Sequence, residues 1–299
     1  MDLNWDDMRV FLAVAREESL SGAGRVLRND PATVGRRVQR LEEALGVTLF
    51  VKSPQGYALT AEGERLLERA EQAEQSIALA LEETQGRAGQ LSGVIRIGAP
   101  DGCANYLLPQ VCTEICDAHP GLEVQIVALP RVFNLSKREA DMAIAVSPPT
   151  TGTRLTVQKI TDYRLHLAAT DSYLRHSPPI ETLADLKRHR LIGYIPDMIF
   201  DKELDYLFEI GAEKADFASN SVSVQFNWIR QGAGVGIVHD FAIPAAPDLR
   251  KLLPGELSLT RAFYLIRHGD DRKVERLNRF AQALCDGLRA EVARLEALT

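Results

Sequence analysis

Cationic side chains gather between Ser19 and Tyr57, although the chain as a whole is acidic, with a formal net charge of −6 over 299 residues. The cations of this stretch are Arg25, Arg28, Arg36, Arg37, Arg40 and Lys52. Only Asp30, Glu42 and Glu43 oppose them. Positive charge concentrated in one region of an acidic chain is typical of a surface that meets phosphate groups. The chemistry expected here is therefore ion pairing with a nucleic acid.

Two helices joined by a short turn must position these cations. Asp30 is a good N-cap, Pro31 suits the first helical position and Gly46 suits the exit, which predicts a helix between them. Its buried stripe is predicted to be Val34, Val38, Leu41 and Leu45. The outward face is then Ala32, Arg36, Gln39, Arg40 and Glu43, with Thr33 and Arg37 on the flank. A preceding helix from Ser21 is predicted to bury Ala23, Val26 and Leu27 and to connect through Arg28 and Asn29.

The hairpin alone leaves two interpretations open, because short helical hairpins with a charged outer face also occur in proteins that never touch nucleic acid. The flanking residues favour DNA. Before the hairpin, a helix from Trp5 to Arg16 is predicted, with Asn4 as cap, Asp7 three residues on, and an inner face of Met8, Phe11, Leu12 and Ala15. After it, two extended pieces around the turn residues 53–56 predict a β-wing. Such a helix-turn-helix enters the major groove by the N-terminal end of its second helix, here Thr33, Arg36 and Arg37.

These elements, the run RRVQRLEEALGVTLF and the wing ending in LTAEGERLL resemble the N-terminal winged helix of the LysR-type transcriptional regulators. The resemblance implies a dimeric, non-enzymatic bacterial transcription factor that reads promoter DNA with this helix and senses a small molecule with the rest of the chain. It also implies a dimer of dimers and contact with RNA polymerase.

The recognition helix departs from the family pattern. The family's helix usually opens Ser, Gln, Pro, Ala, Val, Ser, Arg, whereas residues 30–36 here read Asp, Pro, Ala, Thr, Val, Gly, Arg. Two polar base-edge readers are thus replaced by Pro31 and Gly35. We expect direct readout to rest on Arg36, which can take guanine O6 and N7 together, with support from Thr33 and from DNA shape. Arg37, Arg40 and Lys52 are expected to hold phosphates. The predicted DNA-binding set is Ser21, Arg28, Pro31, Ala32, Thr33, Gly35, Arg36, Arg37, Arg40, Lys52 and Ser53.

Length and composition predict a second, larger unit, because the winged helix uses about 60 of the residues. No apolar run approaches the ~20 residues of a membrane span, and the N-terminus lacks a secretion signal, so a cytoplasmic protein without a membrane partner is expected. The four cysteines, Cys103, Cys112, Cys116 and Cys285, show no metal-ligand spacing. We expect no metal and no cofactor, and free thiols; a redox-sensing role is the weaker alternative, because no cation lies close in sequence.

A Pro-free stretch from Thr60 to Gly86 predicts a long linker helix. Small or apolar residues recur along it in alternating steps of four and three, at Leu66, Ala70, Ala73, Ile77, Ala80 and Thr84. This 3.5-residue period is typical of a helix that pairs with a partner helix, and a symmetric operator calls for a symmetric dimer. The alternative is a solitary solvated linker.

From Val94 onward strand and helix patterns alternate, which predicts parallel sheets covered by helices. The family resemblance implies a two-lobed, periplasmic-binding-protein-like domain with crossing strands near 163–168 and 262–268. The predicted fold is thus an α/β multidomain protein: an N-terminal winged helix-turn-helix (1–59), a linker and dimerisation helix with hinge (60–88), and an α/β effector domain (89–299). In that domain, lobe I is expected at about 89–162 and 267–299, and lobe II at about 163–266.

Ligands of such sheets bind at the carboxyl ends of strands. The rule selects Pro100, Asp101, Gly102, Cys103, Arg131, Ser147, Pro196, Asp197, Asn227 and His239. Gly102 stands where the family's effector often meets a hydroxyl residue. Asp101 has two interpretations: it caps the following helix, or it faces the cleft and favours an uncharged or amine-bearing effector. Arg131 would instead serve an anion.

Two other classes of protein fit poorly. An enzyme would need a recognisable motif, yet GxSxG, a phosphate-binding GKS/T loop and GxGxxG in its required context are absent from the sequence. His239 and Asp240 are adjacent on a predicted strand and so point to opposite faces. A structural DNA-coating protein would carry excess positive charge throughout, against a sequence pI of about 5.6.

Overall fold

The computed structural model describes residues 4–53, 56–84, 90–128, 140–149, 155–269, 271 and 274–299. The chain divides into two compact units, Met1–Gly89 and Gln90–Thr299, and each has its own hydrophobic core. None of the helices in the described residues combines the length and the apolar character needed to cross a membrane.

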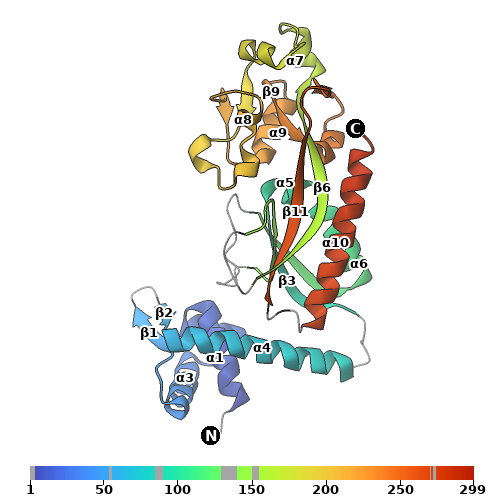
Figure 1. Cartoon of the computed structure of the whole chain (residues 1–299). Helices are drawn as coiled ribbons and strands as arrows, with labels where there is room; N and C mark the ends of the chain where they lie inside the picture. The colour runs from blue at the N-terminus through green and yellow to red at the C-terminus, as the bar shows by residue number, and fades with distance from the viewer. Residues whose placement is uncertain are drawn as a thin grey trace. The chain divides into compact units, whose positions relative to one another are not determined.

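The first unit is a winged helix followed by one long helix (Figure 1). Its elements are α1 (Trp5–Glu17), α2 (Leu20–Leu27), α3 (Pro31–Leu45), β1 (Phe50–Ser53), β2 (Gly56–Leu59) and α4 (Ala61–Thr84). The predicted caps of α3 are confirmed: the Asp30 carboxylate accepts from the Ala32 amide at 2.7 Å, and Gly46 ends the helix with φ +68°. β1 and β2 pair antiparallel as the predicted wing. The Phe11 ring of α1 packs against Phe50 of the wing, with centroids 5.3 Å apart.

Two details of this unit differ from the sequence predictions. α2 begins at Leu20 with Ser19 as its N-cap, and Val26, predicted to be buried, is 63% exposed. α2 is only two turns long, so Ala23 and its two flanking glycines fill the space against the core and leave Val26 outside. Asp7, which comes three residues after the Asn4 cap of α1, is buried and faces α3.

The second unit is built on one sheet of nine strands. The prediction of parallel sheets is wrong in part, because the long strands β6 and β11 pair antiparallel and only some outer strands pair parallel. Its path is β4-β3-β5-β11-β6-β9-β7-β8, and β10 pairs with β6 beside it. The strands are β3 (Ser92–Ala99), β4 (Gly121–Ala128), β5 (Met142–Ala145), β6 (Leu155–Thr170), β7 (Leu191–Gly193), β8 (Phe217–Ala218), β9 (Val235–His239), β10 (Leu249–Leu252) and β11 (Leu259–His268). β6 and β11 pair antiparallel along their length, and the predicted crossing segments fall within them. The other strands then extend the sheet to either side, β5 from β11 and β9 from β6.

Helices cover this sheet. The α-helices are α5 (Asp101–Tyr106), α6 (Leu108–Ala118), α7 (Asp171–Arg175), α8 (Tyr206–Glu209), α9 (Val222–Arg230) and α10 (Glu275–Glu296), and the 3-10 turns are η2 (Leu183–Arg188), η3 (Pro196–Met198), η4 (Lys202–Leu204) and η5 (Asp240–Ala245). α5 and α6 are two separate helices, because Pro109 has no amide to continue a helical ladder and instead occupies the first turn of α6. α10 packs along α6 and β6 (Figure 1).

Candidate functional site

The N-terminal turn of α3 presents an exposed surface of mixed character. Pro31 and Ala32 are exposed there, and the Arg36 guanidinium donates to the Thr33 hydroxyl at 3.0 Å. This bond orients Arg36 along the helix face while its remaining donors stay free for an acceptor. Gly35 is half-buried, and a Cβ there would lie 3.3 Å from Leu20 of α2. The absence of a side chain at Gly35 therefore serves helix packing and leaves Arg36 as the long polar side chain of this turn.

Arg40 is held inside its own unit. Its guanidinium donates to both oxygens of Asp7, through Nε at 2.6 Å and through Nη2. The hydrogen bond that Arg40 donates to the Asp7 carboxylate raises the pKa of Arg40. Arg40 thus has a counterion within its own unit and positions α3 on α1, while its side chain is 57% exposed, so its role as a phosphate contact stays a prediction. Arg37 remains the freer cation, with its Nη1 4.0 Å from Asp6.

The wing is fixed to the end of the recognition helix. One Glu42 oxygen accepts from the amides of Leu49 at 2.6 Å and Phe50 at 3.2 Å. Lys52 follows on β1 and is exposed opposite Tyr57. The side chain of Ser53 lies outside the described residues. Ser21 and Arg28 are exposed at the two ends of α2, so these predicted DNA contacts are accessible and stay predictions.

The predicted dimer seam on α4 is partly used within the unit. Leu66 and Ala70 pack against the winged-helix core, and Ala70 is only 3% exposed. Arg16 of α1 also pairs with Glu74 at 2.6 Å. Leu66 and Ala70 thus contact the core of their own unit, and their predicted part in a dimer seam stays a prediction. Ala73 is half-buried, Ile77 is 42% exposed, and the side chain of Ala80 lies outside the described residues.

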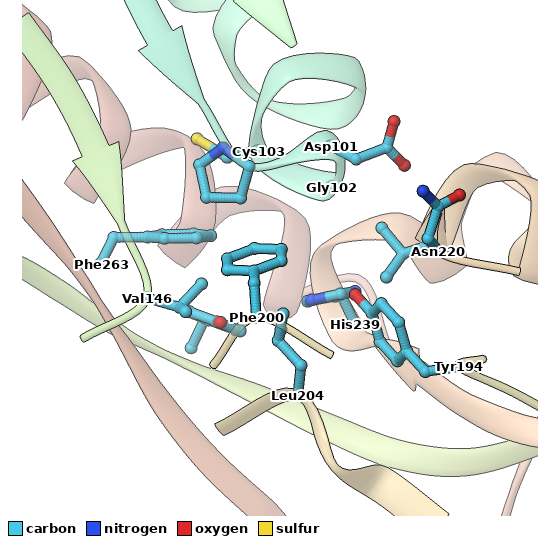
Figure 2. A pocket seen from close by; sticks show the side chains of 13 residues that line it. Asp101, Gly102, Cys103, Val146, Tyr194, Phe200, Leu204, Asn220, His239 and Phe263 are labelled. Carbon is cyan, nitrogen blue, oxygen red and sulfur yellow. The ribbon is translucent and has the colours of Figure 1, made fainter. Parts of the chain in front are cut away.

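The second unit contains a pocket at the carboxyl ends of its strands (Figure 2). It is lined by Pro100, Asp101, Gly102, Cys103, Val146, Tyr163, Tyr194, Phe200, Leu204, Asn220, Val222, His239 and Phe263. Of the predicted effector residues, the structure thus brings together Pro100 to Cys103 and His239. Pro196, Asp197 and Asn227 are exposed and do not line it, and Arg131 lies outside the described residues.

Sequence reasoning missed most of the aromatic wall. Tyr163 and Phe263 belong to β6 and β11 and stack at 4.2 Å between ring centroids. Tyr194 follows β7, and Phe200 lies between η3 and η4. The Tyr194 position, directly after an apolar strand, was available to the same rule that selected Pro100. Tyr163 and Phe263 are internal to their strands and carried no such signal.

Asp101 does not cap its own helix. Its Oδ2 accepts from the Ser221 hydroxyl at 2.9 Å and from the Ser223 amide at 2.8 Å, both in the first turn of α9. Its Oδ1 accepts from Asn105 at 3.1 Å. The structure therefore corrects the capping alternative: Asp101 borders the pocket while its carboxylate joins α5 to α9 across it.

Ser147 makes a second contact of the same kind. Its hydroxyl donates to the Asp201 carboxylate, which also accepts from the Glu203 amide at the start of η4. Ser147 follows β5, whereas Asp201 belongs to the middle segment, residues 171–258, between β6 and β11. Asp101 and Ser147 thus attach the middle segment to the β3 and β5 strand ends at two points.

His239 and Asp240 face different surroundings, as predicted. The His239 ring lies in the pocket beside Tyr163 and Phe241, with centroids 5.5 and 4.8 Å away. Gly102 is closely approached, because a Cβ there would lie 3.3 Å from His239 Cε1. Asp240 is fully buried away from this ring and pairs with His166 and Lys251. Adjacent positions at the strand end therefore do not form a His–Asp catalytic pair.

Burial lowers the pKa of His239 to about 4, against the weaker opposing effect of Asp240 and Asp101. The folded protein thus holds this imidazole neutral, whereas the unfolded chain protonates it near its ordinary 6.5. We expect the free energy of unfolding to fall as the pH falls from 6.5 towards 4, by up to about 3 kcal/mol from this residue.

The measurement is urea unfolding at several pH values in a Trp5→Phe background, where Trp228 is the remaining tryptophan and reports on the second unit. His239→Gln removes the titrating group and keeps a polar side chain, so its unfolding free energy should depend less on pH. Equal slopes for the two proteins over this range would contradict the assignment.

The cysteines give no reactive thiolate. All four are free; burial raises the pKa of Cys112 to about 12 and that of Cys103 further. These thiols stay protonated near neutral pH, which opposes a redox role. In the part of the chain that the structure describes, no cluster of His, Cys, Asp or Glu is suited to a metal ion.

Comparison with known proteins gives consistent similarities over both units. Residues 5–64 match the model "Bacterial regulatory helix-turn-helix protein, lysR family", and residues 88–289 match "LysR substrate binding domain". The regulator PtxR of Pseudomonas aeruginosa is 26% identical, with 98% of this chain and 96% of PtxR aligned.

Solved structures share the fold. A full-length OxyR variant of Pseudomonas aeruginosa superposes with a TM-score of 0.69 at 18% identity, over 97% of this chain and 95% of that one. Full-length LysG of Corynebacterium glutamicum, solved with bound effector Arg, gives a TM-score of 0.62 at 20% identity, over 98% and 99%.

Proposed function

The chain belongs to the LysR-type family of transcriptional regulators, and from this premise we propose that an effector bound between the two lobes of its second unit modulates its binding or bending of promoter DNA. The chain has the helix-turn-helix and the effector-binding domain of that family. Family members bind DNA and small molecules and form oligomers, and the family is not enzymatic. We further propose the domain limits 1–59, 60–88 and 89–299, with the middle segment as the body of lobe II.

The observation that carries the proposal is the pair of contacts across the pocket. Asp101 bonds to the start of α9, and Ser147 bonds to Asp201, so both contacts join residues at the β3 and β5 ends to the middle segment. A ligand that enters between them changes their geometry, and its affinity differs between the two arrangements. That difference in affinity is the requirement for coupling ligand binding to DNA binding.

The DNA-binding part of the proposal places α3 in the major groove and the wing along the backbone. The exposed N-terminal turn of α3, with Arg36 held by Thr33, supports this placement. Arg37, Arg40 and Lys52 contact phosphates, and Arg40 is also held by Asp7. A dimer of dimers and contact with RNA polymerase complete the proposal by analogy with the family.

The test uses the full-length protein on its promoter. Asp101→Asn combined with Ser147→Ala weakens both contacts without adding bulk, and we expect an altered footprint or bend angle relative to wild type. Asp117→Asn, an exposed change on α6, is the matched control. A double variant whose footprint and bend equal those of wild type, in a protein that still binds, would remove the basis for the mechanism.

Self-association through α4 gives a separate prediction. Ile77 is 42% exposed in one chain, and Ala73 lies one turn before it. We expect Ile77→Lys to weaken the dimer, because a cation at a helix seam is desolvated without a counterion. Specific DNA affinity should fall at least about tenfold, since both half-sites are no longer engaged together.

Sedimentation equilibrium over a concentration series measures the dimer, and fluorescence anisotropy measures the affinity. Glu64→Lys is the control, at an exposed position in the first turn of the same helix. A dimer of unchanged strength in Ile77→Lys would mean that residues outside this seam hold the chains together.

A further inference from the structure

Five aromatic or imidazole rings lie in the wall of the pocket. Tyr163, Tyr194, Phe200, His239 and Phe263 all line it. Tyr163 stacks on Phe263 with an interplanar angle of 22°, and His239 lies at 32° to Tyr163. Such walls favour a planar aromatic guest through offset-stacked and edge contacts.

Formal charge is scarce in the described part of this wall. Asp101 is the only ionised side chain among the residues that line the pocket, and its two oxygens accept from Ser221, Ser223 and Asn105. A carboxylate guest would approach this anion with no cation among these lining residues to balance it. An ammonium guest would gain a partner only by taking Asp101 away from the first turn of α9.

Neutral hydrogen-bonding groups are present in the wall. Figure 2 shows Asn220, His239 and Tyr194 on one side of the pocket, with Phe263 on the other. Burial lowers the pKa of His239, so its ring keeps one donor and one acceptor nitrogen at neutral pH. These three side chains suit one hydroxyl or carbonyl group on the guest.

The space itself is small. The cavity has a volume of about 20 Å³, which is room for about one water molecule. A ring therefore enters only if the wall moves. Phe200 is half-buried on the segment between η3 and η4, next to Asp201 that bonds Ser147. Phe200 adjoins Asp201 in the chain, so a ring that displaced Phe200 would also alter the contact with Ser147.

We propose that the effector is a small uncharged aromatic molecule of one ring with one hydroxyl or carbonyl group, bound with its ring among Tyr163, Phe200 and Phe263. This inference rests on the proposed function, because it names the class of molecule that the same pocket takes. An effector of this class distinguishes the chain from a regulator that senses carboxylates or amines.

Three probes that share a ring and nearly the same size test the inference: benzamide, benzoate and benzylamine. Each is titrated into the full-length protein at pH 7.5 and followed by ligand-observed NMR, with competition between pairs of probes. We expect benzamide to bind at least about tenfold more tightly than either charged probe, because a buried unpaired charge is costly. Tighter binding of benzoate or of benzylamine would overturn the proposal.

A second experiment titrates the same probes into Asn220→Arg, which adds a cation to the wall of the pocket. Asn220 is half-buried, so the longer side chain has access to solvent. In Asn220→Arg the preference should reverse, so that benzoate binds at least about tenfold more tightly than benzamide. Asn220→Gln should keep the wild-type order of affinities. Urea unfolding followed by Trp228, in the Trp5→Phe background, shows that the second unit of each variant is folded.

The outcomes separate this inference from the proposed function. A charged probe that binds best overturns the class of effector and leaves effector control standing. Failure of all three probes to bind at about 10 mM, a generous limit for ligands of this size, also overturns the class. Coupling between the two lobes and DNA binding is judged separately by the footprint of the Asp101→Asn and Ser147→Ala double variant, which needs no ligand.

Discussion

Arg36→Ala is expected to lower the affinity for the promoter site about 10- to 100-fold, because one bidentate arginine–guanine pair contributes about 1–3 kcal/mol of discrimination. Affinity for unrelated DNA should fall much less. The reason lies in the first turn of α3, where Pro31 and Gly35 offer no side-chain donor and Arg36 is held in place by Thr33. Few other groups in this turn can replace the lost contact.

Fluorescence anisotropy at fixed salt, with a promoter duplex and a scrambled duplex, measures both affinities. A sequence-specific regulator should prefer the promoter by roughly a thousandfold or more. Arg37→Ala and Lys52→Ala are the comparison variants, because a lost phosphate contact weakens both duplexes equally and lowers the salt dependence by about one ion. If Arg36→Ala stayed within a few-fold of wild type while either comparison variant abolished specific binding, the reader and the anchors would be reversed.

The sequence predicted the first unit well because its signals are local. Caps, turn residues and a buried stripe lie within one helix, so Asp30, Pro31 and Gly46 were enough to place α3. The pairing of Asp7 with Arg40 was not predictable in the same way, because it joins residues 33 positions apart. A carboxylate on the apolar face of α1, next to Met8 and Phe11, was the one local sign of a buried partner.

The pocket was predicted where a general rule of sheets applied and missed where tertiary packing decides. Strand ends led to Pro100 and His239, whereas Phe263 reaches the pocket through the pairing of β11 with β6. The partner of Asp101 lies 120 residues away on α9. The sequence therefore left two roles open for Asp101, which were to cap α5 or to face the cleft. Only the contact with Ser221 decides between them.

The α4 seam shows the limit of periodicity. A 3.5-residue repeat identifies the face of a helix that is buried but does not say what buries it. Leu66 and Ala70 continue the same stripe as Ile77, yet the winged-helix core covers them. The part of α4 that is left free to pair with a partner helix is therefore shorter than the 3.5-residue repeat alone predicts.

Asp240→Ala is expected to lower the unfolding free energy of the second unit by about 3 kcal/mol, because removing one member of a buried ion pair leaves the others without compensation. Asp240 has no exposed surface, and its oxygens lie 2.7 Å from His166 Nδ1, 2.8 Å from Lys251 Nζ and 4.0 Å from Arg164 Nε. The residue thus joins β6, β10 and the end of β9. Lys251 and Arg164 retain some access to solvent, which places the loss near the lower end of the range for buried pairs.

Urea unfolding followed by Trp228, in the Trp5→Phe background, measures this loss within the second unit alone. Asp286→Ala is the matched control: it breaks an ion pair of 2.7 Å with Arg289, but that carboxylate is 58% exposed. The unfolding free energy of Asp286→Ala should fall by less than about 1 kcal/mol, because water already screens this exposed ion pair and can hydrate the arginine that remains. Asp240→Asn keeps the shape of the side chain and removes its charge, so its loss of unfolding free energy should lie between those of Asp240→Ala and Asp286→Ala. A loss in Asp240→Ala no larger than that in Asp286→Ala would mean that burial adds nothing to this network, and that the β6, β9 and β10 strand ends are held by their apolar packing.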